Sequence, residues 1–145
     1  MSGLKEQIQE AIRKEKEAYD LYRLVSASTT DARRREFSAR LAQDAIHHVQ
    51  IIERTCKEHL PSLCTFAQHF VPEIEFDDDD TDSPDEDALF EALKTAIEHK
   101  CQLLEFYSAL AGAQEQVHWS EMFQELLTAE EEHLKFIQAN LPSVP

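Results

Sequence analysis

The chain contains few of the residues that make tight turns. Its 145 residues include only 2 glycines and 5 prolines, whereas an all-β sandwich or barrel needs turn residues at short intervals. Such a fold is therefore excluded. Long apolar runs are missing as well, since no stretch approaches the ~20 consecutive apolar residues of a membrane-spanning helix. The first residues lack the basic and apolar segments of a signal peptide, so we expect a cytoplasmic protein.

Positive charge is also scarce. The sequence has 14 Lys and Arg against 29 Asp and Glu, which gives a formal net charge of −15. Such a field repels phosphate backbones and anionic lipids, so neither nucleic acid nor a membrane is expected as a partner. The 3 cysteines contain no C-x-x-C pair. Neither a zinc knuckle nor a rubredoxin-type iron site is therefore predicted.

Four long segments repeat apolar residues at helical spacing and predict amphipathic helices. Their apolar rows run from about residue 4 to 25, 37 to 52, 89 to 107 and 123 to 137. The expected fold is all-α, with a single domain over residues 1–145. Segment 28–31 supplies a short turn with capping side chains, and segment 83–86 reads as a capping box. Residues 61–83 form a long crossover, in which we expect the acidic run Asp77–Asp80 to be a solvated loop.

The chain resembles itself at a fixed offset of 85 residues, which aligns Tyr22 with Tyr107 and His48 with His133. Further matches are Ala11-Ile12 with Ala96-Ile97, Glu36 with Glu121, Leu41 with Leu126 and Ile52 with Ile137. One helix-turn-helix unit therefore occurs twice. Two like helical hairpins joined by a long crossover predict a four-helix bundle with approximate twofold symmetry.

Polar residues interrupt the apolar rows that face the predicted bundle interior. Glu15 stands in the middle of the first row, and the fourth row contains Glu130-x-x-His133, which places a carboxylate and an imidazole on adjacent turns of one face. A buried carboxylate is unfavourable unless it is paired or bound to a cation. Glutamate and histidine within an apolar stripe therefore indicate a metal site.

Two motifs resemble the rubrerythrin-like branch of the ferritin-like superfamily. Segment 11–22, AIRKEKEAYDLY, is similar to the first-helix ligand motif of that family, and segment 129–133, AEEEH, is similar to its Glu-x-x-His motif. The resemblance spans nearly the whole chain apart from the crossover. It implies a ferritin-like antiparallel four-helix bundle and a di-iron or mixed di-metal oxidoreductase centre that reacts with oxygen or peroxide. The family's ligands are a glutamate from each of two helices and a Glu-x-x-His from each of the other two.

The chain departs from that ligand set at two of six positions, which the repeat identifies. Glu15 aligns with Lys100, and Glu130 aligns with Ala45, while His48 and His133 are both present. The rubredoxin domain that supplies electrons in rubrerythrins is absent from this sequence. Asp44 is one position away from Ala45, about 100° around the helix, and is expected at the boundary of the bundle. A degraded di-iron centre is therefore predicted.

Two interpretations of this degraded centre stay open. In the first, Glu15, His48, Glu130 and His133 hold one Fe, Mn or Zn ion, Lys100 replaces the second metal, and any oxygen or peroxide chemistry is limited. In the second, the same residues form a buried polar network without metal, and the bundle is a non-catalytic structural or protein-interaction module. A homodimer is expected in either case. The catalytic residues, the substrate and the electron donor are not predicted.

Several side chains near these motifs are expected to be structural. Tyr22 and Tyr107 are predicted core aromatics whose hydroxyl groups need partners. Cys101 is expected to be a small packed residue next to Lys100. Trp119 is expected to pack against the crossover or against another subunit.

Overall fold

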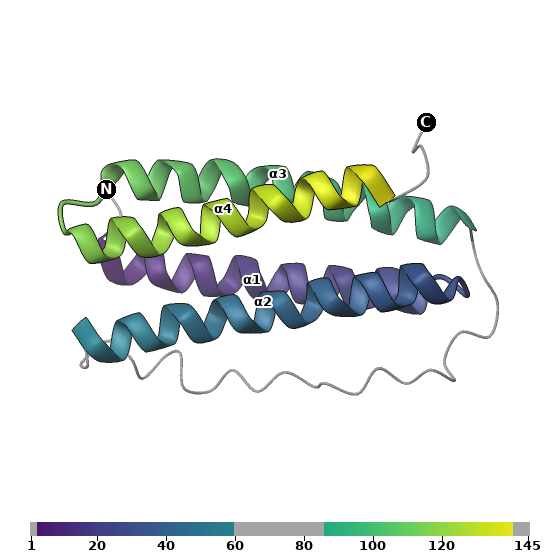
Figure 1. The fold of residues 1–145 in the computed structure, drawn as a ribbon, viewed down its shortest axis with the longest axis horizontal. Helices are drawn as coiled ribbons and strands as arrows, with labels where there is room; N and C mark the ends of the chain where they lie inside the picture. The colour runs from purple at the N-terminus through teal and green to yellow at the C-terminus, as the bar shows by residue number, and fades with distance from the viewer. Residues whose placement is uncertain (1–2, 60–85, 141–145) are drawn as a thin grey trace.

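The computed structural model describes residues 3–59 and 86–140 and contains, over those ranges, four α-helices and no strand. The helices are α1 (Leu4–Ala27), α2 (Ala32–His59), α3 (Glu86–Ala113) and α4 (Val117–Asn140), and they lie along one another as a helical bundle (Figure 1). All four predicted helices are confirmed. The predicted crossover at 61–83, its acidic run and most of the capping box lie outside the described residues.

The connection between α1 and α2 is the short turn that the sequence predicts. The backbone N–H of Ser28 donates to the carbonyl oxygen of Val25 at 3.1 Å and closes the end of α1. Asp31 then caps α2, because its Oδ1 accepts the backbone N–H groups of Arg33 at 2.9 Å and Arg34 at 3.3 Å. An aspartate at this position satisfies amides that have no partner within the helix. The Asp31 side chain therefore defines the start of α2 at Ala32.

The helices pack as two sequential pairs that lie against each other. Helix α1 packs along α2, α3 packs along α4, and the two pairs meet through α1 with α3 and α2 with α4. Of these four packed pairs, α2 with α4 is the least extensive. The four helices therefore enclose one interior, and the middle of each helix lines it.

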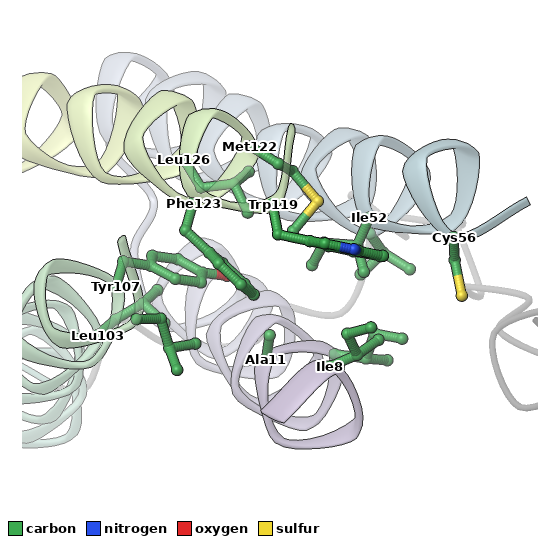
Figure 2. Packing of buried hydrophobic residues seen from close by; sticks show 13 residues of the cluster. Ile8, Ala11, Ile52, Cys56, Leu103, Tyr107, Trp119, Met122, Phe123 and Leu126 are labelled. Atoms are coloured by element: carbon green, nitrogen blue, oxygen red, sulfur yellow. The ribbon is translucent and has the colours of Figure 1, made fainter. Parts of the chain in front are cut away.

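Two apolar clusters fill most of that space. The first core cluster (Figure 2) combines the N-terminal half of α1, the C-terminal halves of α2 and α3, and the N-terminal half of α4. Its largest buried members are Ile8, Ile52, Leu103, Tyr107, Trp119, Phe123 and Leu126. The second core cluster lies farther along the helices and contains Ala18, Tyr19, Tyr22, Leu41, Ala42, Ala45, Ile46, Ala96 and Ile137. The bundle interior thus has an apolar region on each side of its middle.

Trp119 lies deeper in the bundle than a residue that faces another subunit. Its side chain is 1% exposed and lies in the first core cluster (Figure 2), so the expected packing against another subunit was wrong. The alternative expectation, packing against the crossover, concerns residues outside the described ranges. Positions 119, 123 and 126 share one face of α4. Trp119 therefore points inward with Phe123 and Leu126.

No helix in the described ranges is both long enough and apolar enough to cross a membrane.

We predict that the variant F123A loses about 3–5 kcal/mol of unfolding free energy, because it leaves a cavity where a fully buried ring fills the first core cluster. Urea denaturation followed by far-ultraviolet circular dichroism measures this loss. The matched control is L24A, whose parent side chain is exposed, and it should change stability by less than about 0.5 kcal/mol. Equal losses in both variants would contradict the assigned core.

Candidate metal centre

One ionisable side chain from each helix meets in the middle of the bundle. Glu15 of α1, His48 of α2, Lys100 of α3 and Glu130 of α4 are each at most 3% exposed. We call these four residues the central charged cluster. On every helix the cluster residue lies between a member of the first core cluster and a member of the second. Water is therefore largely kept from these charges by apolar side chains on both sides.

His48 connects the two glutamates of the cluster. Its Nδ1 lies 2.9 Å from Oε1 of Glu130 and 3.3 Å from Oε1 of Glu15. Lys100 forms an ion pair with the other carboxylate oxygen of Glu130, Oε2. The four residues therefore make one continuous network across the bundle, and Glu130 is held by both cationic groups.

Two tyrosines complete the network in positions related by the 85-residue repeat. The hydroxyl group of Tyr107 donates to Oε1 of Glu15 at 2.7 Å. The Nζ of Lys100 lies 5.1 Å from the ring centroid of Tyr22, a cation–π contact. Because Glu15 aligns with Lys100 and Tyr22 aligns with Tyr107, each contact is the counterpart of the other. The internal repeat of the sequence is thus reproduced as contacts between equivalent positions of α1 and α3, a hydrogen bond in one case and a cation–π contact in the other.

The electrostatics of the cluster follow from burial and from these contacts. Burial lowers the pKa of His48, but its hydrogen bonds with Glu130 and Glu15 outweigh that effect and raise the pKa to about 10. Burial favours the neutral form of Glu130, yet Lys100 and the histidines hold its pKa well below the usual range. Burial and the neighbouring charge of Glu130 raise the pKa of Glu15. Lys100, His48 and Glu130 are therefore charged at neutral pH in the metal-free protein.

The tyrosines stay protonated beside these charges. Burial raises the pKa of Tyr22 to about 12 and that of Tyr107 well above its usual range. The Tyr107 hydroxyl group can therefore donate to Glu15, whereas the ammonium group of Lys100 has no lone pair and faces the ring of Tyr22. Both side chains are at most 3% exposed, which confirms the prediction that Tyr22 and Tyr107 are core aromatics.

His133 lies at the edge of the cluster. Its Nδ1 is 3.8 Å from Oε2 of Glu130, and its Nε2 is 2.9 Å from Oδ2 of Asp44. The imidazole rings of His133 and His48 stack, with centroids 5.6 Å apart. Asp44 is partly exposed at the bundle boundary, where the sequence placed it. The structure thus brings Glu15, His48, Lys100 and Glu130 together, and it places His133 beside them in a pair with Asp44.

One polar atom of the cluster has no partner. Oε2 of Glu15 is buried and forms no hydrogen bond with the described residues. The ligand atoms of Glu15, His48 and Glu130 lie within 4.8 Å of one another, which is compact enough to surround one metal ion. Carboxylate and imidazole groups suit Fe²⁺, Mn²⁺ and Zn²⁺. The donor set and the orphaned oxygen therefore fit a single divalent cation.

Two further side chains near the cluster differ from expectation or were missed. Cys101 is exposed rather than packed, because it lies about 100° around α3 from Lys100. On the outer side of α1 and α3, Nε2 of His99 lies 3.2 Å from Oε2 of Glu17. Spacing within one helix cannot predict a contact between two helices. The sequence analysis therefore missed the contact of His99 with Glu17 and the hydrogen bond of Tyr107 with Glu15.

Comparison of the chain with protein-family models, with curated proteins and with solved structures found no match. The resemblance of its motifs to the rubrerythrin-like family is therefore carried by the sequence alone.

We predict that K100M destabilises the metal-free protein by about 3–5 kcal/mol, because it leaves the buried carboxylate of Glu130 without its lysine partner. The measurement is urea denaturation in the presence of a chelator. The control is K94M on the same helix, where the side chain is exposed, and stability should change by less than about 0.5 kcal/mol. A K100M protein as stable as its parent would refute the central role of this ion pair.

Proposed function

We propose that this protein binds one divalent metal ion through Glu15, His48 and Glu130, and that Lys100 takes the place of a second metal. The observation that carries the proposal is the buried Glu15 carboxylate, whose Oε2 has no partner although two other ligand-type side chains lie beside it. An unpaired buried acceptor costs about 1–3 kcal/mol. A cation held at this place would remove that cost.

The distances within the cluster support this ligand set. Metal bonds of about 2.1 Å place neighbouring ligand atoms about 3.0–3.4 Å apart around one ion. The separations from Nδ1 of His48 to the two carboxylate oxygens are 2.9 and 3.3 Å. Small side-chain shifts, together with release of the Nδ1 proton of His48, would therefore let Glu15, His48 and Glu130 bind the same ion.

Lys100 supports a stoichiometry of one. Its ammonium group is paired with Oε2 of Glu130, so one side of that carboxylate already faces a permanent cation. Ala45, the repeat equivalent of Glu130, belongs to the second core cluster and offers no ligand atom. A second ion beside the first would meet a positive charge and a methyl group instead of two carboxylates.

We further propose that the bundle is a ferritin-like antiparallel one with a degraded rubrerythrin-like centre. The support is the pair of motifs together with the equivalent contacts of Glu15 with Tyr107 and of Lys100 with Tyr22. Three protein ligands would leave coordination positions open, which is the arrangement of reactive metal sites. When bound, a redox-active ion would supply one-electron chemistry toward oxygen or peroxide. Because the proposed site holds one ion instead of two, we expect any oxidoreductase activity to be limited. The homodimer stays a prediction.

The rival function is a metal-free structural or interaction module. The observation in its favour is that Lys100 and His48 already balance Glu130, and that Tyr107 already donates to Glu15. Both functions use the same residues. They differ in whether the orphaned oxygen of Glu15 gains a metal.

We predict about one Fe²⁺ or Mn²⁺ ion per chain after anaerobic incubation and removal of excess ion, measured by elemental analysis of protein purified without a metal-affinity tag. The variant E15Q should lose this ion, because a neutral amide is a poor ligand. The control E17Q changes a side chain on the same helix that lies outside the cluster, and it should keep the ion. No metal in the folded parent protein would leave the metal-free module as the function.

A separate variant tests the assignment of Lys100 and Ala45. The double variant A45E/K100E restores both missing family ligands, and it should take up about two ions per chain. Because it also places additional carboxylates in the core, its resistance to urea should rise when Mn²⁺ is added. A folded double variant that binds no more metal than its parent would contradict the alignment of the repeat on which the site rests.

A further inference from the structure

The metal ligands proposed above are almost completely enclosed, so an ion must pass other side chains to reach them. Glu15, His48 and Glu130 are each at most 3% exposed. The two core clusters close the bundle interior along its length in both directions. An ion that crossed those clusters would lose its hydration shell among apolar groups, which is highly unfavourable. Entry from the side, between two helices, is therefore favoured.

On the side where α2 meets α4, ligand-type side chains form a continuous path inward. The side chain of Asp44 is 47% exposed, that of His133 is 18% exposed and that of Glu130 is 1% exposed. Asp44 contacts His133 at 2.9 Å, and His133 lies 3.8 Å from Glu130 and stacks on His48. Every step of this path offers a carboxylate oxygen or an imidazole nitrogen to a cation.

The packing of the helices favours the same side. The pair α2 with α4 is the least extensive of the four packed pairs, so side chains between these helices can shift with the least loss of contact. The opposite side, between α1 and α3, also has a histidine–carboxylate pair, His99 with Glu17. There, however, Glu17 also forms an ion pair with Arg13, whose side chain is exposed at the surface. The contacts of Glu17 therefore do not connect it with the central charged cluster.

From these observations we infer that Asp44 and His133 form the entry site for the cation, which then passes along the stacked ring of His48 to Oε1 of Glu130, the carboxylate oxygen that is not paired with Lys100. This inference rests on the proposed function, because it concerns the route to the proposed metal site. Asp44 attracts the cation at the surface and orients His133 through their hydrogen bond. Neither role requires Asp44 to be a ligand of the resident ion.

The test compares the rate of metal uptake with the amount of metal bound. Co²⁺ serves as the probe, and its uptake is followed by stopped-flow absorbance in the parent protein, D44N and E17Q. We expect uptake by D44N to be about tenfold slower, the lower end of the effect that charged clefts have on association rates. The stoichiometry at equilibrium should stay at the parent value. The control E17Q removes one charge on the opposite side, and its uptake rate should equal that of the parent.

The outcomes separate the entry route from the metal site itself. Equal uptake rates in D44N and the parent, at full stoichiometry, overturn the entry route and leave the metal site intact. A slower rate in E17Q than in D44N places entry between α1 and α3 and also overturns it. A lower stoichiometry in D44N makes Asp44 a resident ligand and not an entry residue. Absence of Co²⁺ from the folded parent protein overturns the metal site and the route together.

Discussion

The ion pair between Lys100 and Glu130 is the interaction on which the rest of the bundle interior depends. Both groups are almost completely buried, and two charges removed from water are tolerated only when each compensates the other and further hydrogen bonds complete the arrangement. His48 supplies a further hydrogen bond to Glu130, and Tyr107 donates one to Glu15. Because the four cluster residues come from four different helices, their contacts also fix how the helices are placed along one another.

The asymmetry of the charges in the cluster reflects two pairs of repeat-related positions that carry different residues in the two halves. At the first repeat position the chain has Glu15 in one half and Lys100 in the other, and at the second it has Ala45 and Glu130. These differences complement each other: the lysine finds its partner in Glu130, and Ala45 joins the second core cluster. A charge change at position 100 alone would leave several carboxylates facing one another in the core. The present sequence instead balances them within the protein.

Much of this arrangement could be predicted from the sequence, because it depends on spacing along single helices. The inward rows identified Glu15 and Glu130, and the repeat added His48 and Lys100 to the same layer. Contacts between helices could not be predicted in this way, since they depend on how far each helix is rotated. His133 is one such case, because its pair with Asp44 depends on the distance between α2 and α4.

The orphaned oxygen of Glu15 is what distinguishes this cluster from a simple internal salt bridge. Lys100 and His48 are sufficient to balance Glu130, and Tyr107 donates to only one oxygen of Glu15. Nothing among the described residues satisfies the other oxygen. If the cluster served only to hold the helices together, an apolar residue at position 15 would fill the space without that penalty. A carboxylate with one oxygen free, buried beside an imidazole and a second carboxylate, instead supports the proposed cation site.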